Sequence, residues 1–289
     1  MKKVLIFAVL VLSTLACATL TGGTPTQSVP TPVPSAIQPD VQPSATIPAI
    51  DRKEDVGLYC PSAVPAAVDA YNRALDFENA GDVDSAVISY REAIELDPEY
   101  CDAMDNLALL LKQKGNYEEA VTLYQQSIAI YPDGYVAHLG LANAYSQMEQ
   151  YDKAITEYET MLKLFPDDPE GYYGLGIVYF NIGDYQNSLA QFTRAEEIYK
   201  ALGSSYLPDA QVYIGYNYTM LEDYEKGRDY LELAYPFFQD SSYTNYMLGY
   251  CYFYGETIRN EPLAKQYLTL ARDLGMDLEP ELDTFVDQP

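Results

Sequence analysis

A repeat of 34 residues runs through most of this chain and restricts the folds open to it. Pro98, Pro132 and Pro166 lie 34 residues apart. When units are taken to begin at residues 67, 101, 135, 169, 208 and 242, the eighth residue of every unit is small: Ala74, Ala108, Ala142, Gly176, Gly215 and Gly249. Such a period is typical of stacked units that cannot bury their apolar faces alone.

Large residues recur at fixed distances from these small ones. The eleventh positions hold Phe77, Leu111, Tyr145, Tyr179, Tyr218 and Tyr252. Small side chains let two antiparallel helices approach closely, while the large ones fill the space between helix pairs. Gly81, Gly115 and Gly183 occupy position 15, where the first helix must end in a left-handed residue. Each unit is therefore predicted to be a helix hairpin.

The pattern Leu107-Ala108, Leu111, Gly115-Asn116-Tyr117, Ala120, Tyr124 and Pro132 resembles the tetratricopeptide repeat. The resemblance implies an all-α fold, an α-solenoid of about six hairpins wound as a right-handed superhelix. It divides a domain of residues 56–289 into repeats 67–100, 101–134, 135–168, 169–207, 208–241 and 242–278, followed by a short C-terminal cap. The fourth repeat is lengthened over residues 198–207, and the sixth has extra residues around 257–262.

The N-terminus has the features of an export signal. A basic start at residues 1–3 precedes an apolar run over residues 4–12, which is shorter than the roughly 20 residues that a membrane-spanning helix needs. Residues 1–16 are therefore predicted to be a lipoprotein-type signal peptide. Leu15-Ala16-Cys17 resembles a bacterial lipobox, which implies lipidation of Cys17; an ordinary secretory signal is the alternative.

Residues 17–55 form a segment rich in Pro, Thr and Ser that has little apolar surface to bury. We expect it to be a disordered linker that holds the folded part away from a membrane. With the signal, this predicts an exported protein of the bacterial cell envelope, lipid-anchored to a membrane outside the cytoplasm.

Composition excludes some functions. Lys and Arg total 17 against 43 Asp and Glu, a formal charge of -26, so nucleic acid is not an expected partner. His138 is the only histidine, and no nucleophile, phosphate or zinc motif accompanies it. We therefore expect no catalytic residue, metal site or cofactor, and we expect His138 to pack against a neighbouring helix.

Three cysteines lie within the predicted domain. In an exported protein, Cys60 and Cys101 could be joined by a disulfide or could remain two free thiols, because the conformation of the segment before the first repeat is not given by the pattern. Cys251 is expected to be a buried and inert thiol.

In the tetratricopeptide family, the first helices line a concave surface through positions 2, 5, 9, 12 and 13. In the last three repeats these positions are rich in aromatic residues, which mark interaction sites when they are exposed. The predicted ligand-binding groove comprises Tyr173, Ile177, Phe180, Tyr216, Met220, Tyr246, Tyr250 and Phe253. The alternative for these rings is that they pack on one another or under the end cap.

The resemblance implies binding rather than catalysis. We expect a scaffold or adaptor in cell-envelope assembly that holds a protein or peptide in the groove. The alternative is a glycan-binding surface lipoprotein that uses the same tyrosines.

Overall fold

The protein is seen in a computed structural model that describes residues 60–288. This part of the chain forms thirteen α-helices and one short 3-10 helix, and it contains no strand. The prediction of an all-α solenoid of helix hairpins is confirmed. The predicted signal peptide, the lipidation site Cys17 and the linker of residues 17–55 lie outside the described residues.

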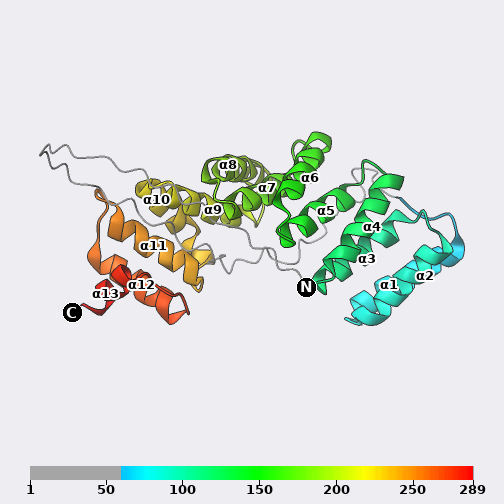
Figure 1. Ribbon diagram of the computed structural model, residues 1–289, viewed down its shortest axis with the longest axis horizontal. Helices are drawn as coiled ribbons and strands as arrows, with labels where there is room; N and C mark the ends of the chain where they lie inside the picture. The colour runs from blue at the N-terminus through cyan, green and yellow to red at the C-terminus, as the bar shows by residue number, and fades with distance from the viewer. Residues whose placement is uncertain (1–59, 289) are drawn as a thin grey trace, which may run out of the picture. The chain divides into compact units, whose positions relative to one another are not determined.

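The helices pair in chain order, and each pair packs against the next (Figure 1). The first three pairs are α1 (Pro65–Asn79) with α2 (Val83–Leu96), α3 (Cys101–Gln113) with α4 (Tyr117–Ile130), and α5 (Tyr135–Gln147) with α6 (Tyr151–Leu164). The next three are α7 (Pro169–Asn181) with α8 (Tyr185–Leu202), α9 (Leu207–Met220) with α10 (Tyr224–Ala234), and α11 (Ser242–Tyr254) with α12 (Glu261–Asp273). The 3-10 helix η1 (Tyr235–Phe237) follows α10, and α13 (Pro280–Asp287) follows α12.

The core follows from the alternation of small and large side chains. Ala74, Ala86 and Ala93 are fully buried where α1 meets α2. Tyr124 packs directly on the backbone of Gly140, where a Cβ atom would overlap its ring. Tyr158 packs in the same way on Gly174, so glycine at these positions makes room for a buried tyrosine between successive repeats.

The turn inside each hairpin requires a left-handed residue. Gly81, Gly115 and Gly183 have φ values of 76°, 79° and 80°, which glycine adopts without a steric penalty. In the third and fifth repeats Glu149 (φ 57°) and Glu222 (φ 63°) adopt this conformation instead. The turn geometry is therefore kept even where the glycine is missing.

Two features depart from the regular repeat. Helix α8 has 18 residues and ends at Leu202, where Gly203 caps it with a φ of 62°. The lengthened fourth repeat is therefore an extension of its second helix. After the last pair, α13 buries Leu282 and Val286 and packs on α12.

Candidate functional site

Most of the aromatic side chains predicted to line a groove are buried. The exposed fraction is 0% for Tyr216, 1% for Tyr246, 8% for Phe180 and 9% for Tyr173. The expectation that these four rings face a solvent-filled hollow is therefore corrected. Their assignment to a ligand-binding site loses the exposure on which it depended.

The buried rings contact one another across successive repeats. The ring centroid of Tyr216 lies 5.4 Å from that of Tyr213 and 4.7 Å from that of Tyr243. Its hydroxyl is 2.6 Å from the Thr244 hydroxyl. Burial raises the phenol pKa of Tyr216, so this side chain is a neutral core residue that links α9 to α11.

The cap covers the end of the same row. Tyr246 donates a hydrogen bond of 2.5 Å to Glu279, which immediately precedes α13. The ring of Phe253 meets Phe285 of α13 at a centroid distance of 4.7 Å. Tyr246 and Phe253 of α11 are thus partly covered by α13 and the residue before it.

The remaining predicted groove residues are half-buried. They are Ile177, Met220, Tyr250 and Phe253. Tyr250 contacts Tyr246 and Tyr254 at centroid distances of 5.7 and 4.4 Å, and burial raises the pKa of its phenol. These four side chains keep a surface that a ligand could reach, and their role stays a prediction.

The reason for the burial lies in the spacing of adjacent first helices. Tyr216 is at position 9 of its repeat and Tyr243 at position 2 of the next, and α9 and α11 are in contact. A position that faces the concave side therefore also faces the following first helix. Large rings at both positions fill the gap, and this pairing is the signal in the sequence that favours packing.

His138 is 4% exposed and lies between two acceptors. Its Nδ1 meets the Glu157 carboxylate of α6, and its Nε2 is 2.7 Å from the Pro132 carbonyl oxygen. Burial alone would lower the imidazole pKa, but the hydrogen bonds to Glu157 and Pro132 outweigh it, so the pKa is raised. An imidazolium, which donates from both nitrogens, satisfies this arrangement.

Asp105 of α3 lies in the same junction. Its side chain is 8% exposed. Burial is the main influence on its carboxyl pKa, Ser127 of α4 and the charge of His138 lower that pKa, and the charge of Asp102 raises it. Its Oδ1 atom is buried and has no partner. Burial raises the pKa of this carboxyl to about 7, so the second and third repeats meet at a buried titratable group.

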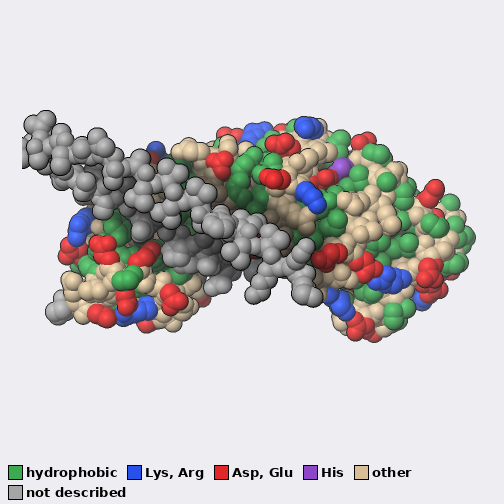
Figure 2. Space-filling model, in the orientation of Figure 1, with side chains coloured by type: hydrophobic (Ala, Val, Ile, Leu, Met, Phe, Trp, Pro, Cys, Tyr) green, Lys and Arg blue, Asp and Glu red, His purple; other side chains and the backbone are tan. Residues whose placement is uncertain are grey.

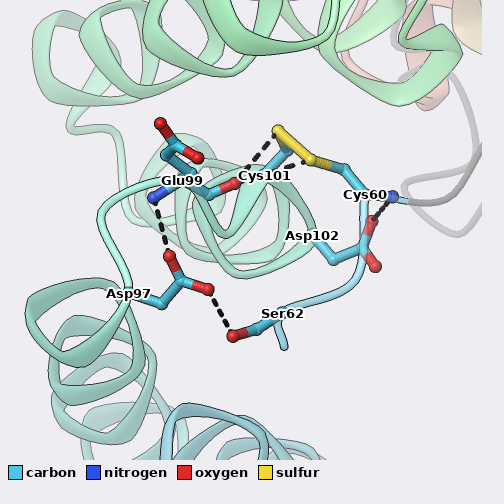
Figure 3. The surroundings of a disulfide bond; sticks show 6 residues. All are labelled: Cys60, Ser62, Asp97, Glu99, Cys101 and Asp102. Carbon is cyan, nitrogen blue, oxygen red and sulfur yellow. Dashed lines mark hydrogen bonds between the residues drawn. A yellow bond between two sulfur atoms is a disulfide. The ribbon is translucent and has the colours of Figure 1, made fainter. Parts of the chain in front are cut away.

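Cys60 and Cys101 form a disulfide (Figure 3). Their Cα atoms are 5.4 Å apart, and 41 residues separate them in the sequence. Cys251 is free and buried, and burial raises the pKa of its thiol to about 12. The thiol of Cys251 is 3.1 Å from the Thr219 hydroxyl, which makes it a core side chain.

Residues 60–288 lack the features of two other kinds of site. No cluster of three or more His, Cys, Asp or Glu side chains in this range is arranged to hold a metal ion. None of the helices described here is both long and apolar enough to cross a membrane.

Carboxylates are spread over the visible face in Figure 2, with Lys and Arg side chains between them.

Three family models, all described as tetratricopeptide repeat, match this chain at residues 64–135, 111–175 and 169–202. The segments within residues 64–202 that these models match are tetratricopeptide repeats. The matched residues include α1 to α8, and α9 to α12 continue the same hairpin arrangement.

Solved structures of tetratricopeptide repeat proteins share the fold. Pseudomonas aeruginosa PilF aligns with a TM-score of 0.63 and 16% identity, over 76% of this chain and 96% of that chain. YrrB, a TPR protein with an unusual peptide-binding site, aligns with a TM-score of 0.54 and 22% identity, over 68% of this chain and 95% of that chain. No curated protein matches the sequence.

A chain of the Cut9–Hcn1 hetero-tetramer of APC/C also aligns, with a TM-score of 0.61 and 17% identity over 82% of this chain. The alignment spans 44% of that longer chain. At these identities the similarity establishes the tetratricopeptide fold and nothing more specific.

The tetratricopeptide register points to accessible apolar side chains in the N-terminal half. Leu109, at position 9 of the second repeat, is 37% exposed, and Val136, at position 2 of the third, is 49% exposed. Leu75 and Ile177 share position 9 in their repeats and are half-buried. Of these four residues only Ile177 belongs to the groove predicted from the sequence, because that prediction rested on the aromatic positions of the last three repeats.

Proposed function

We propose that this protein is a non-catalytic, exported and lipid-anchored scaffold or adaptor in cell-envelope assembly. Its repeats bind a protein or peptide on the side formed by the first helices. The observation that carries this proposal is the stack of tetratricopeptide hairpins that leaves Leu109 and Val136 exposed at first-helix positions. Exposed apolar residues on a rigid framework are typical of interaction surfaces.

The family supports binding, and the N-terminus supports the location. Tetratricopeptide repeats commonly bind proteins or peptides, and YrrB is described as having a peptide-binding site. The predicted export signal and the lipobox-like Cys17 are the reason for placing the protein at a membrane surface. The ligand-contacting set that we propose combines Leu109 and Val136 with the half-buried Ile177 and Met220.

The glycan-binding alternative loses its support. It required stacked tyrosine rings that a sugar can reach, yet Tyr216 and Tyr246 are 0% and 1% exposed. We therefore retain the protein or peptide ligand alone.

Binding is tested by capture from detergent-solubilised host envelope with the full chain, using a Leu109→Asp, Val136→Asp variant. Two buried charges at the contact should lower capture of a specific partner at least about tenfold. The matched control is Ile88→Asp, since Ile88 is 67% exposed on the second helix α2 and should leave capture unchanged. Equal capture by all three proteins would refute this binding surface.

The anchor is tested with Cys17→Ser in the host. The native chain should incorporate a labelled fatty acid and sediment with membranes, because one or more acyl chains partition into the bilayer. The variant should lose the label and, without the lipid, should no longer sediment with membranes. Retention of the label by the variant would show that Cys17 is not the attachment site.

A further inference from the structure

We propose that the Cys60–Cys101 disulfide is a modification site for a thiol–disulfide oxidoreductase, which attacks at Cys60 and so unlocks the first hairpin. The inference rests on the different exposure of the two cysteine residues and on the position of the bond in the array. It does not depend on the ligand that the repeats bind.

The disulfide crosses the boundary between the first two repeats. Cys60 precedes α1, whereas Cys101 is the first residue of α3. The whole α1–α2 hairpin therefore lies inside the covalently closed loop. The bond therefore joins the segment before α1 directly to the second repeat.

Hydrogen bonds hold the segment before α1 in the same place (Figure 3). The Cys60 backbone N–H donates to the Asp102 carboxylate at 3.3 Å. The Ser62 hydroxyl donates to Asp97, in the turn between α2 and α3, and Asp97 also accepts from the Glu99 backbone N–H at 3.1 Å. The disulfide is thus the covalent member of a cluster that attaches this segment to α3.

The first hairpin needs such an attachment more than the others do. Among residues 60–288 it is the terminal repeat. It has a neighbouring repeat on one side only, through the contact of α2 with α3. In a solenoid, stability is a sum of repeat and nearest-neighbour terms, so a terminal unit opens most readily. Without the bond, the polar link across the boundary includes Asn106, which donates to Tyr71 and Tyr90 at 3.0 and 3.2 Å.

The two cysteine residues differ in accessibility. Cys101 is 1% exposed, whereas Cys60 is half-buried. Thiol–disulfide exchange requires a thiolate to reach one sulfur in line with the bond, so access decides which sulfur is attacked. Cys60 is therefore the sulfur that accepts the incoming thiolate, and Cys101 is the leaving group.

The exchange proceeds in two steps. A thiolate of the reduced oxidoreductase bonds to Cys60 Sγ, the Cys60–Cys101 bond breaks, and Cys101 leaves as a thiolate that takes up a proton. The second thiol of the oxidoreductase then attacks the oxidoreductase sulfur that is bonded to Cys60. This frees Cys60 as a thiol. Two electrons pass from the dithiol to the protein, and the oxidoreductase is left as a disulfide.

Unlocking changes the surface that the second repeat presents. Ala103, Met104 and Leu107 of α3 are buried, and movement of the first hairpin away from α3 would uncover part of this surface. A bond that closes a loop of 41 residues removes about 4 kcal/mol of unfolded-chain entropy. Reduction should therefore raise the open population of α1–α2 by roughly 10²- to 10³-fold.

The regiochemistry is tested with reduced glutathione on the full chain carrying Cys17→Ser. Brief reaction is followed by a maleimide quench and peptide mapping by mass spectrometry. Glutathione should be found on Cys60 and maleimide on Cys101, with at least about a tenfold preference that reflects sulfur access. Glutathione mainly on Cys101, or a pair that is already reduced in protein isolated from the envelope, would overturn the proposal.

Unlocking is tested by hydrogen exchange with and without dithiothreitol. Amides of α1 and α2 should exchange roughly 10²- to 10³-fold faster after reduction, while those of α11 and α12 serve as an internal control and should not change. Cys60→Ser should reproduce the effect without reductant and should then be insensitive to dithiothreitol. Unchanged exchange in α1–α2 would show that the bond does not lock the hairpin.

Discussion

Replacing Tyr216 with alanine should lower the free energy of unfolding by about 4 kcal/mol. The ring is 0% exposed and contacts Phe180, Tyr213 and Tyr243, so truncation leaves a cavity that its neighbours cannot close. Tyr216→Phe keeps the ring and loses only the hydroxyl bonded to Thr244, which should cost about 1 kcal/mol. Urea unfolding followed by far-UV circular dichroism measures both changes.

A matched aromatic control separates burial from the general effect of removing a ring. Phe237 is 70% exposed, so Phe237→Ala should change stability by less than about 0.5 kcal/mol. A similarly small change for Tyr216→Ala would mean that the ring faces solvent and that the predicted groove assignment should be restored. For the same reason, alanine variants at Tyr216 and Tyr246 are unsuitable binding tests, because they would unfold part of the array.

The hairpins were predictable because their packing is local in the sequence. Ala74 and Ala86 lie in helices joined by a short turn, so small residues at fixed spacing report directly on how closely the two helices approach. Even where Glu149 replaces the turn glycine, the surrounding spacing indicates the same hairpin. Periodicity therefore predicted the hairpins, and the resemblance to the tetratricopeptide repeat implied their stacking into a solenoid.

The accessibility of the groove was not predictable in the same way. Whether Tyr216 is exposed depends on how closely α11 approaches α9 and on the side chain at Tyr243, 27 residues away. Similarly, α13 lies beyond the repeats and covers Phe253 through Phe285. Register identifies the face of a helix, but the neighbouring helix decides whether that face reaches solvent.

The disulfide falls between these cases. Pairing Cys60 with Cys101 was one of two alternatives that the sequence allowed. The geometry depends on the path of residues 60–64, which is set by contacts such as Ser62 with Asp97 and Cys60 with Asp102. Those contacts lie outside the repeat pattern, so periodicity carried no information about them.

Asp105→Asn should make the protein more stable above pH 7, by about 2 to 4 kcal/mol. The ordinary carboxyl pKa of 3.8 is raised to about 7 by burial in the native state. Native Asp105 therefore holds its proton where the unfolded chain has lost it, and stability falls as pH rises from about 4 to about 7. Asparagine carries no charge, so the variant avoids the cost of burying an ionised group whose Oδ1 has no partner.

The comparison is made by urea unfolding at a series of pH values, with Glu118→Gln as the control. Glu118 is an exposed carboxylate in the first turn of α4, so its removal should leave the pH dependence unchanged. The Asp105→Asn and native curves should converge near pH 4 and separate as pH rises to about 7. Parallel curves over this whole range would contradict a buried titrating Asp105.

His138 should account for the pH dependence that remains in the Asp105→Asn chain. Its native pKa is raised above 6.5 by Glu157 and the Pro132 carbonyl, so its stabilisation is complete below pH 6.5 and is lost as pH rises through the native pKa. Both groups thus weaken the junction between the second and third repeats at higher pH, but in different windows. A second replacement, His138→Gln, should remove the upper window, because a neutral amide can still donate one hydrogen bond yet cannot form the ion pair with Glu157.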